Sequence, residues 1–312
     1  MTHNGEGADN ERAHVGSSAW TDRAKNAVRP AYDWIKRQPV YWYSHLALWR
    51  LMLRNARSSS SVVGDAPVVV SLTSYGRRVN RVAYAVESIA AGNVRPQRLI
   101  LWLDEPLDAD ALPPALLRLR RRGLEIRQTV DHGPHKKYFP YAVSEVQHGL
   151  PLATADDDVI YPSGWLRGLL VAHDSLPDAV HCYRANVVPI VDGHIVPYAS
   201  WPRCTTTQPS ARHFATGVSG VLYPPRMLDD LGRRGTEFVD KAPTADDIWL
   251  HWVALQLGIP VKQVAQRPVH FPFIPGSQAT SLASTNVQGG GNDRWIGGLY
   301  SLADRETIVS AP

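Results

Sequence analysis

Three aspartates, Asp156, Asp157 and Asp158, follow one another directly after the apolar stretch at 151–155. Adjacent carboxylates repel one another, and a hard divalent cation such as Mg²⁺ or Mn²⁺ relieves that repulsion by taking their oxygens as ligands. Such an ion is usually held by one or two carboxylates, with substrate phosphates completing its coordination. The triplet therefore predicts a Mn²⁺ or Mg²⁺ site for a phosphorylated ligand. The alternative is a solvated acidic turn before the next helix.

A second motif supplies positive charge. The segment DHGPHKKYFP, residues 131–140, places Lys136 and Lys137 after a Gly-Pro turn. Ammonium groups held on a loop near the strand ends would neutralise the charge of a phosphate. The alternative for this motif alone is a pair of exposed lysines on a surface loop.

A second acidic pair, Asp246 and Asp247, lies in ADDIWLHW at the expected start of a helix. Thr244 can cap this helix, and the helix dipole stabilises a carboxylate in its first turn. The same dipole lowers the proton affinity of Asp247, which keeps it ionised at neutral pH. The functional alternative is that one of the two carboxylates takes a proton from an attacking hydroxyl. His270 is an isolated candidate for a ligand or a base.

Alternating strands and helices have to position these residues. The β-branched run PVVVSLT at 67–73 predicts a buried strand, and apolar residues at helical spacing predict a helix at 79–90. We expect further strands at 98–103, 124–129 and 151–155, and further helices at 113–123, 164–174 and 243–258. This pattern predicts an α/β fold with a mainly parallel sheet flanked by helices. Ligands collect at the carboxyl ends of such strands, where Thr73, Tyr75, Asp104 and the triplet fall.

The composition is that of a globular chain of 312 residues, with 44% hydrophobic and 20% charged residues. A net charge of +4 suits contact with phosphates or an anionic membrane surface and is too weak to indicate nucleic-acid binding. The two cysteines, Cys182 and Cys204, lack metal-type spacing, and no secretory signal precedes them. We therefore expect reduced thiols in a cytoplasmic protein.

The first 65 residues differ from the rest in composition. Residues 1–28 are rich in Asn, Gly, Ser and charge, so we expect them to be disordered. Residues 29–65 are expected to form an aromatic and basic helical extension that ends in the linker SSSSVVGD. Within it, residues 32–57 mix tryptophan with arginine, which suits peripheral contact with a membrane. The alternative is a helix that packs its aromatic side chains on the main domain, residues 66–312.

Several motifs occur in a fixed order along this domain. They are VVVSLTSYGRRV, LILWLDEPL, LPPALLRLRRRGLEI, GPHKKYFP, TADDDVIYP, TGVSGVLYPP, TADDIWLHWVA and IPGSQATSL. Together they resemble a family-2-like bacterial glycosyltransferase family of capsule and cell-wall polysaccharide clusters, which has the GT-A fold. The resemblance covers the chain from Pro67 to about Trp295.

This resemblance implies transfer of a sugar from a nucleotide-sugar donor, first of all a UDP-sugar, to a hydroxyl of a glycan or lipid-linked glycan. It implies a divalent metal, Mn²⁺ or Mg²⁺, held by Asp158 and Asp156, with His270 as a candidate third ligand. Asp157 or Asp156 would contact the ribose. The donor-binding half would span about 66–162, and the acceptor and catalytic half about 163–312. Such an enzyme would work in the cytoplasm, at the inner face of the cell membrane if residues 32–57 dock there.

The remaining residues of the site follow from the same resemblance. Thr73, Tyr75 and Asp104 would hold the nucleoside, and Lys136 or Lys137 would meet the diphosphate. Asp247, with Asp246 as the second choice, would be the base of an inverting enzyme. Two other functions stay open. A sugar nucleotidyltransferase should carry a Gly-rich, Arg-containing loop after the first strand, and a non-catalytic carbohydrate- or membrane-binding protein would need no base.

Overall fold

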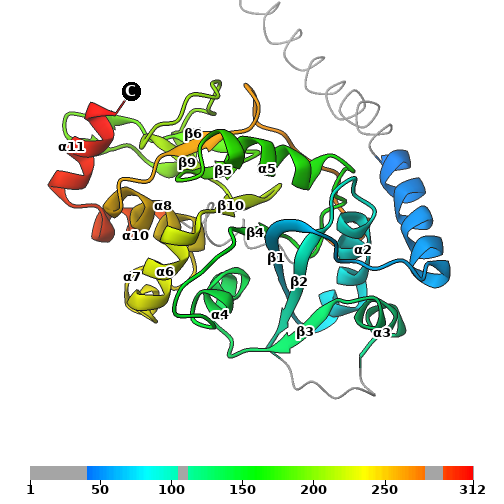
Figure 1. The fold of residues 1–312 in the computed structure, drawn as a ribbon. Coiled ribbons are helices and arrows are strands. Elements are labelled where there is room, and N and C mark those ends of the chain that lie inside the picture. The colour runs from blue at the N-terminus through cyan, green and yellow to red at the C-terminus, as the bar shows by residue number, and fades with distance from the viewer. Residues whose placement is uncertain (1–40, 105–111, 278–290, 312) are drawn as a thin grey trace, which may run out of the picture.

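The computed structural model describes residues 41–104, 112–277 and 291–311. Its centre is a seven-stranded sheet of order β11-β5-β10-β4-β1-β2-β3 (Figure 1). The strands are β1 (Ala66–Ser74), β2 (Pro96–Leu103), β3 (Glu125–Gln128), β4 (Leu152–Ala155), β5 (Val180–Cys182), β10 (Val221–Tyr223) and β11 (Val261–Gln263). All neighbours pair in parallel except β10, which is antiparallel to β4 and β5.

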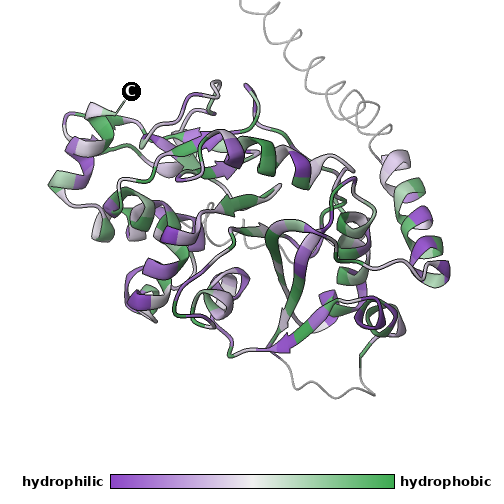
Figure 2. Ribbon diagram, in the orientation of Figure 1, coloured by the Kyte–Doolittle hydropathy of each residue, from purple (hydrophilic) through white to green (hydrophobic). Residues whose placement is uncertain are grey.

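Helices on both faces of the sheet give it two hydrophobic cores. One core takes residues from α2 (Val79–Ala90), α3 (Pro114–Arg121) and α5 (Trp165–Ser175). The other takes residues from α4 (Phe139–Ala142), α6 (Pro225–Arg234), α7 (Phe238–Lys241) and α8 (Asp246–Gln256). Strand β1 alternates between them: Val68 and Val70 enter the first core, and Val69 enters the second. Figure 2 shows the resulting concentration of hydrophobic residues in the central strands, as expected of strands buried on both faces.

Shorter elements complete the described chain. Two small antiparallel sheets pair β6 (Ala185–Val187) with β9 (His213–Ala215) and β7 (Ile190–Val191) with β8 (His194–Ile195). Short 3₁₀ helices are η1 (Gly76–Arg78), η2 (Gly133–Lys137) and η3 (Tyr198–Ser200), and α10 (Gly291–Leu299) and α11 (Leu302–Ser310) lie at the C-terminal end.

The expected α/β class, a mainly parallel sheet flanked by helices with an N-terminal helical extension, is confirmed, and the GT-A type stays a prediction. The helix expected at 79–90 is α2, and the strand expected at 67–73 lies within β1. Cys182 and Cys204 are free and buried. Each core takes residues from before and after position 162. The division into a donor-binding and an acceptor half stays a prediction, and residues 1–28 lie outside the described residues.

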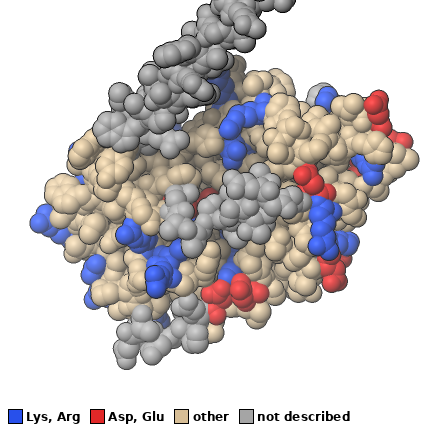
Figure 3. Space-filling model, turned by 180° about the vertical axis from the view of Figure 1, so that it is seen from behind, with Lys and Arg blue, Asp and Glu red and all other residues tan. Residues whose placement is uncertain are grey.

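The extension is a helix over residues 41–57 that lies beside α2 and α3 (Figure 1). None of the helices in the described ranges is both long and apolar enough to cross a bilayer. On the left of Figure 3, the side of this helix, basic side chains are scattered over a mainly uncharged surface. Among the described residues visible in that view, the acidic patches lie toward the centre and right.

Candidate active site

The sheet register brings the ends of three strands to one edge. Leu72 of β1 lies opposite Ala155 of β4, and Ser74 lies opposite Leu103 of β2. Because these strands are parallel, the residues that follow them emerge together, as the sequence pattern predicted. This edge therefore carries Tyr75, Asp104 and the aspartate triplet.

Asp157 is held by the protein itself. The Ser74 hydroxyl donates to its Oδ2 at 2.7 Å, and Arg78 Nε donates to the same oxygen at 3.0 Å. The Arg78 guanidinium also pairs with Asp158 Oδ2 at 3.0 Å. These bonds tie the triplet to the end of β1 and to η1. Sequence reasoning missed Ser74, the last residue of β1, and Arg78 of η1, although both lie in the motif VVVSLTSYGRRV.

The two lysines of η2 form ion pairs with different carboxylates. Lys137 Nζ lies 2.6 Å from Asp156 Oδ1, whereas Lys136 pairs with Asp104 and, at 2.7 Å, with Asp131 Oδ1. Burial alone would lower the pKa of Lys136, but its hydrogen bonds to Asp104 and Asp131 outweigh this and raise it. Both lysines are therefore positively charged and point toward the strand ends. From the sequence alone, they could equally have been exposed lysines on a surface loop.

Two of the three residues expected to hold a nucleoside, Tyr75 and Asp104, lie around Lys136. Its ammonium lies 5.6 Å from the centre of the Tyr75 ring, which is partly exposed. Asp104 pairs with the same ammonium. Thr73 instead donates its hydroxyl to the carbonyl oxygen of Trp102 at 3.2 Å, within the β1–β2 pair. Tyr75, Asp104 and Lys136 thus form one cluster, and the Thr73 hydroxyl is used inside the sheet.

Asp246 and Asp247 are the first two residues of α8, as expected, but the residue at the N-cap position is not the one that the sequence predicted. The residue at the N-cap position is Ala245, whose side chain makes no capping hydrogen bond. Ala245 therefore takes the N-cap position that was expected for Thr244, because the helix begins one residue later than that expectation requires. Asp247 Oδ1 instead accepts a hydrogen bond from the Gly217 N–H at 2.9 Å.

The environment of Asp247 favours its protonated form. Burial first, and then the neighbouring charge of Asp246, raise its pKa to about 7, against the opposing effects of Lys137 and the Gly217 N–H. The sequence-based expectation that the helix start lowers the proton affinity of this carboxyl is wrong. Desolvation and like charge outweigh the dipole. A carboxyl with a pKa near neutrality is well suited to accept a proton at physiological pH.

Lys137 is where the two acidic motifs meet. Burial would lower its pKa, but the charges of Asp156, Asp246 and Asp247 raise it. A Cβ added to Gly217 would lie 3.1 Å from Asp247 Oδ1 and 3.5 Å from Lys137 Nζ, so both groups approach the same glycine. One ammonium therefore faces the carboxylates after β4 on one side and those of α8 on the other.

His270 lies apart from this arrangement. Its Nε2 is 3.2 Å from a guanidinium nitrogen of Arg203. Partial burial lowers the pKa of His270, and the charges of Arg184 and Arg203 lower it further. In residues 41–104, 112–277 and 291–311, no three His, Cys, Asp or Glu side chains converge as a metal site. The structure therefore does not bring His270 together with Asp156 and Asp158.

Asp156 and Asp158 nevertheless fit a hard cation. Burial first, and then the charges of Asp156 and Asp157, raise the pKa of Asp158 to about 6, against the effect of Arg78 and Lys137. A divalent cation would remove this cost by compensating the crowded charge. Two carboxylates completed by phosphate oxygens are an ordinary set for Mg²⁺.

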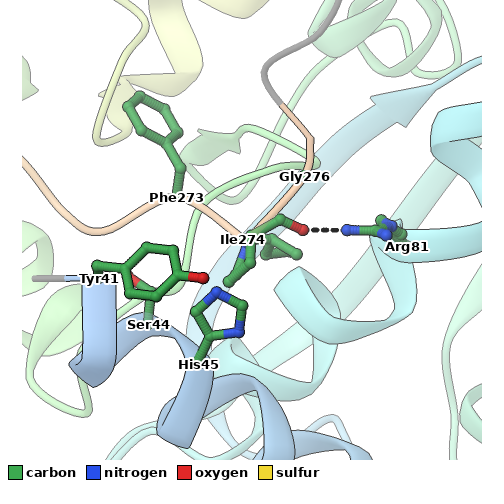
Figure 4. Close-up of a pocket in the computed structure, with 8 residues that line it drawn as sticks. Tyr41, Ser44, His45, Arg81, Phe273, Ile274 and Gly276 are labelled. Carbon is green, nitrogen blue, oxygen red and sulfur yellow. Dashed lines mark hydrogen bonds between the residues drawn. The ribbon is translucent and has the colours of Figure 1, made fainter.

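A cavity of about 570 Å³ adjoins this edge. It lies between Tyr41, Ser44 and His45 of the N-terminal helix, Arg81 of α2, and the segment 273–276 (Figure 4). Arg81 donates a hydrogen bond to the carbonyl oxygen of Pro275. In the same segment, the Ile274 N–H donates to the backbone oxygen of Asp158 at 2.7 Å. The wall of the cavity is thus joined directly to the triplet.

No protein family model matches the chain, and no curated protein matches its sequence. Similar solved structures include the mannosyltransferase PcManGT from Pyrobaculum calidifontis in complex with GDP-Man and Mn²⁺. It is 12% identical with a TM-score of 0.47, over 87% of this chain and 77% of that one.

Residues 1–349 of S. aureus TarS are 13% identical with a TM-score of 0.45, over 78% of this chain and 69% of that one. A CMP:2-keto-3-deoxy-manno-octonic acid synthetase complexed with CTP is 10% identical with a TM-score of 0.38, over 64% and 89% of the two chains. Identities of 10–13% do not show that this chain shares the activity of any of these proteins.

Proposed function

We propose that the protein is a metal-dependent, inverting glycosyltransferase of the GT-A type. It would move a sugar from a nucleotide-sugar donor to a hydroxyl of a glycan or lipid-linked glycan. A UDP-sugar is the first candidate for the donor. The observation that carries the proposal is the meeting of two carboxylate sets at Lys137, one after β4 and one at the start of α8. One set suits a metal diphosphate, and the other includes a carboxyl with a pKa near neutrality.

The donor would lie along the carboxyl edge of the sheet. Thr73, Tyr75 and Asp104 are proposed for the nucleoside, and Asp156 or Asp157 for the ribose. The existing bonds of Asp157 to Ser74 and Arg78 favour Asp156 for this contact. Lys137 is the better placed lysine for the diphosphate, because Lys136 already serves Asp104 and Asp131.

The proposed metal, Mn²⁺ or Mg²⁺, would be held by Asp158 and Asp156, whereas His270, the third ligand expected from the sequence, lies beside Arg203. When bound, such an ion would supply positive charge for the departing diphosphate. Lys137 would supply further charge from the protein, after exchanging its bond to Asp156 for one to a phosphate oxygen.

The chemical step would use Asp247. The acceptor hydroxyl would lose its proton to an Asp247 carboxylate oxygen while its oxygen attacks the anomeric carbon of the sugar. The bond between that carbon and the diphosphate oxygen would break at the same time, and the nucleoside diphosphate would leave with both electrons. Attack from the face opposite the leaving group inverts the anomeric configuration. Asp246, next to Asp247, raises its proton affinity and is the second choice as base.

A screen of nucleotide sugars with and without Mn²⁺ tests this function. A donor that binds should raise the melting temperature in a metal-dependent way. NMR of the transfer or hydrolysis product should then show the opposite anomeric configuration to the donor. Release of pyrophosphate from a nucleoside triphosphate would instead indicate a sugar nucleotidyltransferase. Tight donor binding without any turnover would indicate a binding protein.

The biological setting remains part of the proposal. We infer a role in cell-envelope or capsule polysaccharide synthesis, in the cytoplasm and with peripheral membrane contact through 32–57. The part of that segment within the described residues is the helix over 41–57, which supports the contact by exposing tryptophan beside arginine.

A further inference from the structure

The helix over 41–57 turns an apolar surface away from the protein. Trp42, Leu46 and Trp49 are 67%, 48% and 56% exposed. Their spacing of four and three residues places them on one side of the helix. Ser44, Leu51 and other buried positions lie on the opposite side. We call the surface of Trp42, Leu46 and Trp49 the aromatic face.

A buried ion network fixes this helix to the domain. The fully buried Glu87 of α2 accepts hydrogen bonds from Arg54 Nε at 2.9 Å and from Arg122 at 2.8 and 3.0 Å. Asn55 donates to the Ala115 carbonyl oxygen at 3.2 Å and accepts from Arg118 Nε at 2.9 Å. Breaking such a network leaves buried charge unpaired, which is costly. The aromatic face is therefore presented on a rigid element.

Within the described part of the chain, the helix over 41–57 carries charged side chains of one sign. Residues 41–57 contain Arg50, Arg54 and Arg57 and no Asp or Glu. The exposed Arg120 and Arg121 of the adjacent α3 add to this charge. Figure 3 shows the corresponding side of the molecule with basic side chains on a mainly uncharged surface. Tryptophan at the centre and arginine at the margin match the boundary of an anionic bilayer, where rings enter the headgroup layer and guanidinium groups meet phosphates.

We propose that the aromatic face docks the protein on an anionic phospholipid bilayer. This inference deepens the proposed function, because it makes the acceptor one that is reached at the membrane. The cavity supports this placement: its wall includes Tyr41 and His45 of the same helix and the segment bonded to Asp158 (Figure 4). A docked helix would therefore hold the active-site edge beside the lipid surface.

Vesicle flotation of the full-length protein tests the docking. The vesicles contain phosphatidylcholine alone or with about one third phosphatidylglycerol, at low salt where electrostatic attraction is strongest. We expect binding to the anionic vesicles and at least a tenfold weaker partition for the double variant Trp42→Ser/Trp49→Ser. The matched control is Leu302→Ser/Val309→Ser, which removes exposed apolar side chains from α11 and should bind like the wild type.

Three results would overturn the proposal. One is failure of the wild type to float with anionic vesicles, and another is equal binding by the tryptophan variant. The third is a wild-type dimer, detected by light scattering, that becomes a monomer in the tryptophan variant while flotation stays unchanged. In that case a second copy of the protein would cover the aromatic face. Donor hydrolysis, measured without vesicles, separates this inference from the proposed function. Docking without hydrolysis leaves the membrane surface standing, and hydrolysis without docking leaves the enzyme standing.

Discussion

Replacing Asp247 by asparagine is expected to stabilise the protein and nearly abolish its turnover. The carboxyl is half-buried beside Asp246, and its pKa rises from 3.8 to about 7. In the fully buried limit, keeping such a group ionised costs about 4 kcal/mol. Solvent screening at this half-buried position reduces the cost to about 1–2 kcal/mol. Asparagine removes the charge and keeps an oxygen that can accept the Gly217 N–H.

The pH dependence of this gain has a defined sign. Because the pKa of Asp247 is higher in the folded than in the unfolded protein, its contribution to wild-type stability falls as the pH rises from about 4 to about 7. The advantage of Asp247→Asn should therefore be complete above pH 7 and vanish below about pH 4. At pH 8 we expect a melting temperature about 2–6 °C above that of the wild type.

Turnover should move in the opposite direction. Loss of a general base lowers turnover by about 10²–10⁴-fold while the donor still binds. Wild-type turnover should rise with pH through about 7, as the Asp247 carboxyl loses its proton. Thermal melts and transfer assays across pH check both effects, with Asp240→Asn as a control that removes an exposed acidic charge. A variant of Asp247 that melts lower and transfers sugar normally would refute this reasoning and leave a structural role.

Two further variants test how Lys137 joins the motifs. Lys137→Met removes the ammonium that faces Asp156 and Asp247, so it should weaken donor binding. Because that ammonium lowers the pKa of Asp247, its loss should also move the rise of turnover with pH to values above 7. An unchanged pH–turnover profile would contradict this. Gly217→Ala places a methyl group 3.1 Å from Asp247 Oδ1 and should lower turnover about tenfold with little change in melting temperature. Gly149→Ala, where the added methyl group meets no atom within 4 Å, is its control, and equal rates for the two variants would count against the crowded geometry.

Local pattern was enough to predict much of the fold. The apolar spacing at 79–90 predicted α2, because burial on one face of a helix requires apolar residues at helical spacing. The continuous β-branched run predicted β1, because a strand buried on both faces is apolar throughout. The parallel strands then placed Tyr75, Asp104 and the triplet at one edge without knowledge of any side-chain contact.

What the sequence could not supply were contacts between distant residues. Lys137 is directed at Asp156, 19 residues away, and Asp247 is bonded to Gly217, 30 residues away. The pKa of Asp247 depends on burial by the folded chain, and a local dipole argument therefore gave the wrong direction. Arg78 was overlooked for the same reason, since its partners Asp157 and Asp158 are adjacent to it only in the folded protein.

The central claim is that Asp158 and Asp156 hold a divalent ion together with a nucleoside diphosphate. Isothermal titration calorimetry with UDP, in the presence and absence of Mn²⁺, measures this directly in the wild type and in Asp158→Asn. We expect wild-type binding that depends on Mn²⁺, and a variant that keeps its fold but loses that dependence. Wild-type affinity for UDP that is the same with and without Mn²⁺, or an unchanged Mn²⁺ effect in Asp158→Asn, would contradict the claim.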